Sequence, residues 1–186
     1  MIRRLEKMGA VLAVFYGMAM SNACAQGIEF NFSTTVDCIA SHEKQGDAAH
    51  CIGQSATECL DKGVAAPALK QLCVFSEFEE WEKRLKAVYP ALQQHLQDQD
   101  DEVLAWGWGR LSKADALQDL DDSWYPYVEA QCYFELSLWE GLADKNEVIW
   151  CQMKQTAKHV LLLESVIKDT CRHDHCQEEK YPKWPN

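Results

Sequence analysis

The sequence predicts an all-α protein, a disulfide-stapled antiparallel bundle of three long helices preceded by two short ones. Three observations support this fold class. Apolar residues recur every three or four positions over three long stretches, as on one face of a helix. No stretch shows the apolar–polar alternation of a half-buried strand. Nine cysteines in 186 residues, together with an N-terminal export signal, indicate covalent cross-links.

Residues 1–25 have the features of a cleavable signal peptide. Three basic residues lie among the first seven, and the apolar run that follows is shorter than the ~20 residues of a bilayer span. The tripeptide at 23–25 matches a small-x-small cleavage pattern. We therefore expect a single mature domain, 26–186, in the periplasm or secreted. The alternative is a lipoprotein acylated at Cys24, which Ser21 disfavours because a Leu-like residue is usual there.

Cleavage would leave a strongly acidic mature chain. It removes three of the 18 basic residues and one of the 29 acidic ones, so 15 remain against 28 and the net charge is −13. This charge argues against nucleic acid or an anionic membrane surface as the partner. The mature chain also has no apolar stretch long enough to span a membrane, so we expect a soluble protein.

Two short helices and one long helix are expected in the first half of the mature chain. The short ones cover 36–44 and 48–61 and are separated by a glycine-containing turn. The first long helix covers 66–97, with Pro67 in the first turn, where proline is tolerated. The polar run that follows is expected to end it. Its apolar stripe consists of Leu69, Leu72, Phe78, Leu85, Val88, Leu92 and Leu96.

Two further long helices complete the predicted bundle. The second covers 113–140, with Ser112 as a capping residue and Pro126 as an internal kink. The third covers 146–169 and follows a glycine turn. The repeat of the second helix contains Leu117, Leu120, Trp124, Tyr127, Gln131, Phe134 and Leu138. The repeat of the third contains Ile149, Met153, Ala157, Val160, Leu163 and Ile167.

The eight cysteines of the mature chain are an even set in an oxidising compartment, so we expect disulfides. The set is Cys38, Cys51, Cys59, Cys73, Cys132, Cys151, Cys171 and Cys176. Pairing each cysteine with its neighbour in the chain would staple adjacent helices. A bridge from Cys132 to Cys151 would contribute ~3 kcal/mol by loop closure. Eight cysteines allow 105 pairings, and spacing alone does not select among them.

Catalysis and metal binding have little support in the sequence. Cys171 and Cys176 enclose two histidines, but Cys-x4-Cys is wide for a metal site and His173 and His175 are too close together, so a disulfide is expected. No nucleophile elbow, Gly-rich phosphate loop, HExxH or EF-hand pattern occurs. We therefore expect a protein that is not an enzyme and has no cofactor or metal. A small metal-binding protein that uses this C-terminal cluster is an alternative.

Five sequence blocks follow one another in a fixed order between residues 51 and 164. They are CIGQSATEC, CVFSEFEEWEKRLKAVYPAL, LQDLDDSWYPYVEAQCYFE, LWEG and CQMKQTAKHVLLLE. Together they resemble the exported lysozyme-inhibitor family of the LprI type. The resemblance implies a small helical domain that binds and blocks a lysozyme. Its markers are Glu77, Trp81, Leu85, Tyr89, Trp124, Pro126, Tyr127, Cys132, Cys151, Thr156 and Leu163.

Three places depart from the pattern of that family. Asp121 and Asp122 stand where Gln-Arg is usual, Val128 stands where an Arg follows the Tyr, and His159 replaces an Arg three residues after Thr156. If those arginines join helices through carboxylates in the family, the internal polar contacts of this protein differ from the usual ones. If they contact a partner, this chain contacts a different one. An envelope scaffold protein with the same fold and no lysozyme contact is therefore an alternative function.

A protein partner is the function that charge and resemblance together favour. Many lysozymes are cationic and hold catalytic carboxylates in a cleft, so an acidic chain would be drawn to them. Trp is common at interface hot spots, and an Arg could reach those carboxylates. The alternative is that Trp106 and Trp108 pack beneath their turn and that the acidic residues are solvated surface. These acidic residues are Asp98, Asp100, Asp101, Glu102, Asp115, Asp119, Asp121 and Asp122. The candidate anchors are Trp106, Trp108, Arg110, Asp101 and Glu102.

Overall fold

The structure is a computed structural model that describes residues 28–42, 48–62, 66–105, 111–138 and 145–174. Every regular element in these ranges is helical, which confirms the predicted fold class. None of the helices described there is long and apolar enough to cross a membrane. The predicted signal peptide lies outside the described residues.

The N-terminal part consists of α1 (Ser33–His42), the 3-10 turn η2 (Ala49–Cys51) and α2 (Gln54–Asp61). The second short helix was predicted as one continuous element, and this is wrong, because the chain breaks at Gly53. Gly53 has a φ of 92°, which side chains with a Cβ rarely adopt. A Cβ there would also lie 2.7 Å from Cζ3 of Trp150. Glycine therefore allows both the break and the close packing of Trp150.

Three long helices follow: α3 (Pro67–Ala105), α4 (Lys113–Ser137) and α5 (Lys145–Asp174). Pro67 is the first residue of α3 and Pro126 lies within α4, both as predicted. The predicted cap is also confirmed, since the Ser112 side chain accepts a hydrogen bond from the backbone N–H of Asp115 at 3.0 Å.

The predicted end of α3 after residue 97 is wrong, because the helix continues to Ala105. Side-chain hydrogen bonds link successive turns of its polar part. The Gln94 amide donates to Asp98 at 2.8 Å, and the Gln97 amide donates to Asp101 at 3.0 Å. Residues four apart are neighbours on a helix, so such pairs add local support where apolar packing ends.

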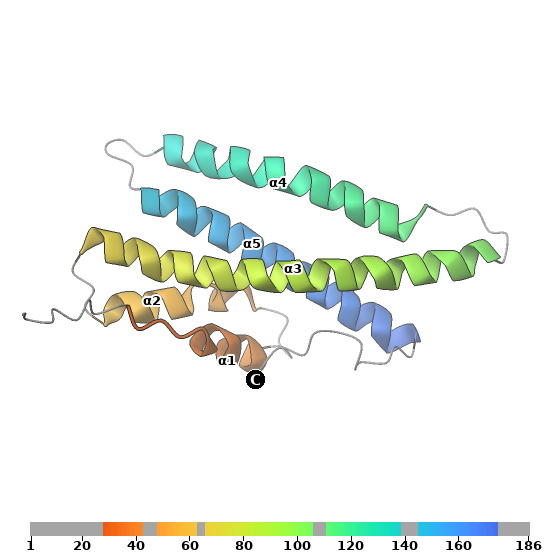
Figure 1. Cartoon of the computed structure of the whole chain (residues 1–186), viewed down its shortest axis with the longest axis horizontal. Helices are drawn as coiled ribbons and strands as arrows, with labels where there is room; N and C mark the ends of the chain where they lie inside the picture. The colour runs from red at the N-terminus through yellow and green to blue at the C-terminus, as the bar shows by residue number, and fades with distance from the viewer. Residues whose placement is uncertain (1–27, 43–47, 63–65, 106–110, 139–144, 175–186) are drawn as a thin grey trace, which may run out of the picture.

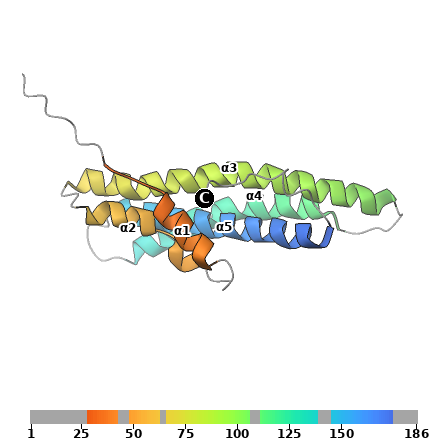
Figure 2. The ribbon, with the colours of Figure 1, turned by 90° about the horizontal axis from the view of Figure 1, so that it is seen from below.

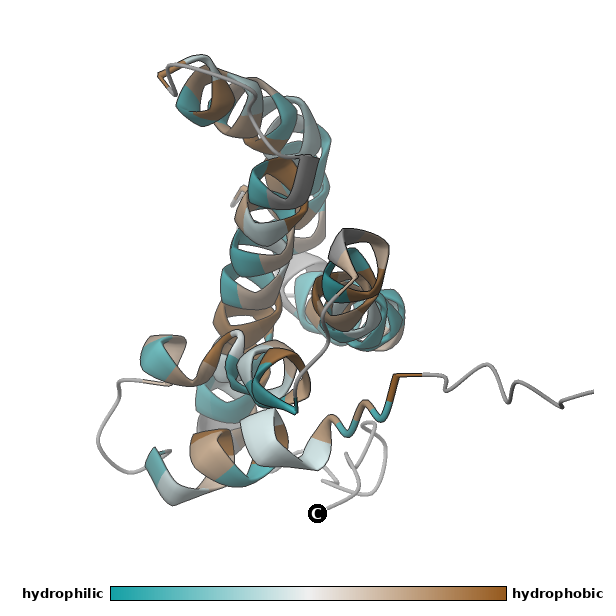
Figure 3. Cartoon of the chain, turned by 90° about the vertical axis from the view of Figure 1, so that its left-hand side faces the viewer, coloured by the Kyte–Doolittle hydropathy of each residue, from teal (hydrophilic) through white to brown (hydrophobic). Residues whose placement is uncertain are grey.

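The three long helices form an up–down–up bundle (Figure 1). α3 and α5 run in the same direction and pack most extensively on one another, and α4 returns in the opposite direction beside both. α1 and α2 lie together on the side of the bundle away from α4 (Figures 1 and 2). The helices carry both hydrophobic and hydrophilic positions (Figure 3), as expected for helices that each bury one face.

The hydrophobic core lies mainly between α3 and α5. Trp81 is fully buried, and the ring of Phe32 meets it edge-on with centroids 5.4 Å apart. Leu117 and Ala114 are the buried contributions of α4 to this core. The other buried members are Val74, Val88, Leu92, Leu96, Met153, Ala157, Val160, Leu163 and Ile167.

Three of the four local disulfide pairs are present. Cys38 is bonded to Cys51, Cys59 to Cys73, and Cys132 to Cys151. The bridges respectively join α1 to η2, α2 to α3, and α4 to α5. The fourth pair, Cys171 with Cys176, stays a prediction because Cys176 lies outside the described residues.

A buried carboxylate holds the N-terminal part onto α3. Glu77 is 0% exposed and accepts hydrogen bonds from the backbone N–H groups of Gly53 and Ala56, both at 2.7 Å. Its Oε1 also accepts from the Thr35 hydroxyl at 3.1 Å and from Trp81 Nε1 at 3.2 Å. Gly53 has no side chain to cap α2, so a carboxylate from α3 satisfies this helix end instead.

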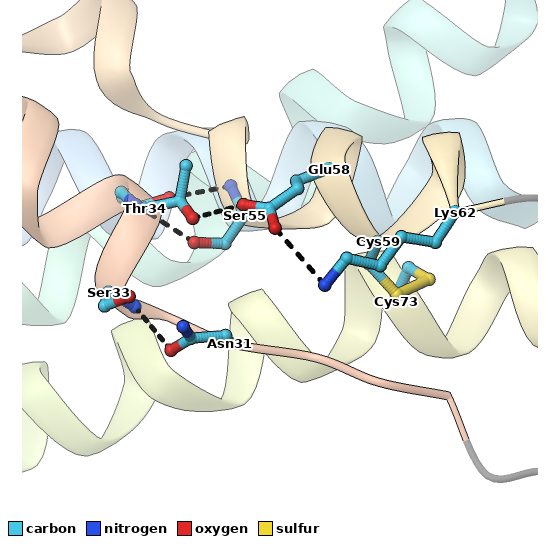
Figure 4. A network of polar contacts seen from close by, with 9 residues as sticks. Asn31, Ser33, Thr34, Ser55, Glu58, Cys59, Lys62 and Cys73 are labelled. Atoms are coloured by element: carbon cyan, nitrogen blue, oxygen red, sulfur yellow. Dashed lines mark hydrogen bonds and ion pairs between the residues drawn. A yellow bond between two sulfur atoms is a disulfide. The ribbon is translucent and has the colours of Figure 1, made fainter.

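A second, half-buried set of polar contacts lies beside it (Figure 4). The Thr34 hydroxyl donates to Glu58, and Lys62 lies 3.2 Å from the same carboxylate. The hydrogen bond from Thr34, with a smaller contribution from Lys62, lowers the pKa of Glu58 below its ordinary value. Because these side chains are in contact with water, they add little to stability.

α3 and α5 are also joined by a buried ion pair. Arg84 donates from Nη2 to both carboxylate oxygens of Glu164, at 2.7 and 2.8 Å, and from Nε at 3.1 Å. The two side chains are 7% and 11% exposed. The guanidinium also lies 5.0 Å from the ring centroid of Trp81. The pair therefore joins the two helices at an enclosed position beside the core.

Candidate partner-binding face

α4 has a buried face and a separate exposed apolar stripe. Ala114, Leu117, Val128 and Cys132 are buried against the bundle. Four apolar side chains at spacings of seven, seven and four share another face of the helix. This α4 stripe consists of Leu120, Tyr127, Phe134 and Leu138, which are 43%, 62%, 62% and 66% exposed.

The apolar repeat of α4 suggests that all its members face the bundle, but the α4 stripe is exposed. The predicted repeat contains Leu117, which is buried, together with all four members of the stripe. Only one face of α4 meets α3 and α5, and α4 lies at the outer side of the bundle (Figure 1). A row of apolar side chains that a helix presents to water is a feature of interaction surfaces. The seven-residue spacing from Leu120 to Phe134 was the signal for this row.

The same helix also has many acidic side chains. α4 contains six acidic residues and one basic residue. Asp122 lies three residues before the exposed Tyr125, and Glu129 lies four residues before the exposed Tyr133, so acids and aromatics are neighbours on the surface. The exposed acids are Asp115, Asp119, Asp122, Glu129 and Glu135. The helix therefore presents aromatic area within a negative field.

Two of the predicted anchors are placed by the structure. Asp101 and Glu102 are exposed near the C-terminal end of α3. Trp106, Trp108 and Arg110 lie outside the described residues, so their role stays a prediction. These three belong to the segment that joins α3 to α4, the helix that bears the stripe.

One member of the predicted acidic surface is instead structural. Asp100 is 8% exposed and accepts hydrogen bonds from the Ser112 hydroxyl and the Ala114 N–H, both at 2.9 Å. Burial acts to raise its pKa, but the hydrogen bonds from Ala114, Lys113 and Ser112 outweigh this and lower the pKa below its ordinary value. Asp100 therefore positions the start of α4.

The departures from the family pattern meet where α4 packs on α5. His159 is 4% exposed, and its ring stacks on Trp124 with centroids 4.4 Å apart. Its Nε2 lies 3.6 Å from Asp121, too far for a hydrogen bond, and has no hydrogen-bond partner among the described residues. Val128 is buried nearby on α4. These positions therefore belong to helix packing, with Asp122 alone fully at the surface.

The burial of His159 predicts a loss of stability in mild acid. Burial lowers its pKa below 6.5, and the charge of Asp121 offsets only part of that shift. Below pH 6.5 the unfolded chain therefore binds a proton that the folded chain does not, so the free energy of unfolding falls with pH. We expect wild type to lose up to about 1.4 kcal/mol per pH unit more than His159→Phe in this window. Urea unfolding of both proteins at pH 7.5, 6 and 5 measures the free energy of unfolding. The same dependence on pH in wild type and in His159→Phe would contradict the prediction.

Residues 59–170 match the family described as lysozyme inhibitor LprI, and this match covers more than half of the chain. The chain belongs to the LprI family. No curated protein and no solved structure matches it. The residues of this LprI-family match contain α3, α4 and most of α5, and therefore the whole α4 stripe. They begin after α1 and η2.

Proposed function

We propose that this protein is an exported, non-catalytic inhibitor that binds a cationic lysozyme-type muramidase through α4. The observation that carries the proposal is the exposed α4 stripe with its surrounding acids, inside the residues that match the family. Aromatic side chains give an interface much of its energy, whereas acidic ones raise the rate of encounter with a basic partner. The formal charge of −11 for the whole chain suits the same partner.

The segment between α3 and α4 is proposed as the second part of the contact. Trp106, Trp108 and Arg110 would extend the surface of α4, and Asp101 and Glu102 would flank it. Trp supplies large contact area, and Arg110 would pair with carboxylates in the lysozyme cleft. Trp106→Ala with Trp108→Ala tests this part in the assay described next.

The test is inhibition of a cationic lysozyme by the oxidised mature chain, 26–186, at low and at physiological salt. Inhibition that persists at physiological salt supports a specific blocker. Inhibition at low salt alone would indicate charge attraction without a docked surface. No inhibition at either salt, across several lysozyme classes, would favour the envelope scaffold function. The positions where the family usually has arginine do not by themselves favour the scaffold function. Two of them, Val128 and His159, are buried between helices.

Removing the two aromatic members of the α4 stripe is expected to weaken inhibition. Tyr127→Ala with Phe134→Ala removes exposed side chains, so affinity should fall about 10- to 100-fold while the thermal unfolding temperature changes little. Leu72→Ala with Phe75→Ala is the matched control, because these α3 side chains are 45% and 41% exposed and lie on another helix. Equal losses in both variants would contradict docking through α4.

The acids of α4 are expected to act on the association rate. Asp119→Asn with Asp122→Asn should slow association several-fold at low salt and much less at physiological salt, since steering by exposed charges is screened. The dissociation rate should change little. Stopped-flow or surface binding at the two salts separates the rates. An effect confined to dissociation would instead place these acids in direct, desolvated contacts.

A further inference from the structure

Four metal-binding side chains meet where α1 and η2 come together. Cys38 and His42 are four residues apart on α1, so they share a face, and η2 supplies His50 and Cys51. One ligand atom from each lies within 4.8 Å of the others. His50 Nε2 is 3.7 Å from Cys38 Sγ and 3.6 Å from Cys51 Sγ. The two imidazole rings meet edge-on with centroids 4.3 Å apart.

These separations suit a tetrahedral zinc ion. Zn–S bonds of about 2.3 Å and Zn–N bonds of about 2.0–2.1 Å place neighbouring ligand atoms roughly 3.3–3.8 Å apart. The two distances from His50 to sulfur already fall in this range. His42 Nδ1 lies 3.9 Å from Cys38 Sγ and 2.9 Å from the carbonyl oxygen of Cys38, so its N–H would donate to that carbonyl and leave Nε2 for the ion. A ring N–H that donates to a carbonyl in this way orients many ligating histidines.

The oxidised protein does not offer this ligand set, because Cys38 and Cys51 are bonded to each other. Thiolates, and not disulfide sulfurs, are the ligands of zinc. We propose that Cys38, His42, His50 and Cys51 form a redox-controlled zinc site, which opens when a dithiol of the thiol–disulfide oxidoreductase class reduces this bridge.

The chemistry of the switch balances without any further reactant. The dithiol gives two electrons to the Cys38–Cys51 bond, so its own sulfurs become a disulfide and two cysteine thiols form. Zinc then binds both sulfurs and both neutral imidazoles, and the two thiol protons leave to solvent. Reoxidation reverses the exchange: the disulfide form of an oxidoreductase of the same class takes two electrons from the thiolates and two protons from solvent and becomes a dithiol. The Cys38–Cys51 bond then forms again and the ion is released.

Access differs among the three bridges in a way that favours this one. Cys38 and His42 are half-buried and His50 is exposed, whereas Cys51 is 0% exposed, so a reductant would reach this bridge through the sulfur of Cys38. His50 also lines an open hollow of about 390 Å³. In the other two bridges, Cys59 and Cys73 are 2% and 0% exposed, and Cys132 and Cys151 are 1% and 7% exposed. Limited reduction of the folded protein should therefore open Cys38–Cys51 first.

The cluster lies outside the family match, which begins at Cys59. Blocking a lysozyme through α4 does not use it. The site is therefore a property of the N-terminal part of this chain, beyond the proposed inhibition.

The test uses the tag-free mature chain, 26–186, reduced under anaerobic conditions with limiting dithiothreitol. Alkylation and mass spectrometry establish that Cys38 and Cys51 are the reduced residues. Co²⁺ then serves as a visible probe, and Zn²⁺ is added to displace it. We expect one ion per chain, thiolate-to-cobalt absorption, and zinc affinity about 100-fold or more above that of the disulfide form. If reduction lowers the helical content, zinc should restore it.

Variants decide which residues bind the ion. His42→Ala with His50→Ala should abolish the thiolate–cobalt band, whereas His173→Ala with His175→Ala is the control and should keep it. Absence of the band after verified reduction overturns the proposal. So does a band that survives the first pair of substitutions or disappears with the second, since the ion would then lie elsewhere, for example at the C-terminal cysteines.

Discussion

Glu77→Ala is expected to lower the free energy of unfolding by about 4 kcal/mol. The substitution leaves four donors without their acceptor: the N–H groups of Gly53 and Ala56, the Thr35 hydroxyl and the Trp81 indole. The site is fully buried, so each orphaned donor costs about 1–3 kcal/mol unless water enters. Urea unfolding of the oxidised protein, followed by circular dichroism, measures the loss.

Glu77→Gln separates the acceptor role from the volume of the side chain. The amide keeps the shape but turns one oxygen into a donor that faces other donors, so we expect a loss of about 2 kcal/mol. Glu80→Ala and Glu80→Gln are matched controls on the same helix, because Glu80 pairs with the exposed Lys83. These should change stability by less than about 0.5 kcal/mol. Losses at Glu77 as small as those at Glu80 would show that the network carries little of the fold.

The loss of stability at Glu77 is expected to be largest in the N-terminal helices. Glu77 joins α1, α2 and α3, whereas the α4–α5 contact does not involve it. Hydrogen exchange in Glu77→Gln should therefore speed up first in α1 and α2 and least in the middle of α5, since local openings follow local contacts. Uniform acceleration would mean that the protein unfolds as a single unit.

The long helices could be predicted from sequence because their signals are local. Ser112 before the repeat, Pro67 at a first turn and the three–four spacing of apolar residues each act within a few residues. Pairing each cysteine with its neighbour was one of the 105 pairings that the sequence left open, and the structure shows three of its four bridges. The family resemblance is confirmed by the match over 59–170, which begins at the last residue of the first block.

The buried face of α4 could not be predicted from its own repeat. Leu117 and Leu120 both fit a helical period, yet Leu117 is 6% exposed and Leu120 is 43% exposed. Which of them is covered depends on where α3 and α5 lie, and that information is outside the helix. The same limit applies to Asp100, which looks like one acid in a solvated run but lies beneath the start of α4.

The metal-binding cluster was missed for a related reason. Cys38 and His42 have helical spacing, but His50 and Cys51 lie in a 3-10 turn whose position depends on the break at Gly53 and on Trp150. Histidines close to cysteines in the chain are more obvious at residues 171–176, where two histidines lie between two cysteines. The pattern Cys-x3-His followed by His-Cys was the available signal.

The helices differ in how many of their faces are packed against the rest of the bundle. α3 and α5 share the core and the enclosed ion pair, and α1 and α2 are tied down by Glu77 and two disulfides. α4 is bonded to α5 through Cys132–Cys151 and buries one face. The packed pair α3 and α5 thus supports one helix whose other faces are exposed, and this arrangement suits the preorganised surface that we propose for α4.

Arg84→Met is expected to destabilise the protein by about 3 to 5 kcal/mol, because Glu164 would keep a charge in an enclosed site after losing the three hydrogen bonds from the guanidinium. Glu164→Leu should cost a similar amount for the converse reason. Combining the two removes both charges and leaves apolar side chains of similar volume between α3 and α5. The double variant is therefore expected within about 1 kcal/mol of wild type, or above it.

The control for this cycle is the exposed pair formed by Lys86 and Glu82, whose side chains are 74% and 44% exposed. Lys86→Met should change stability by less than about 0.5 kcal/mol.

The double variant also tests whether the Arg84–Glu164 pair sets the register of α3 on α5, because Arg84 lies over Trp81 as well as against Glu164. If the double variant unfolds as cooperatively as wild type, apolar packing alone sets that register. If it is stable but unfolds over a broad range, the ion pair selects one packing among several. Additive losses in the double variant would contradict the coupling between Arg84 and Glu164.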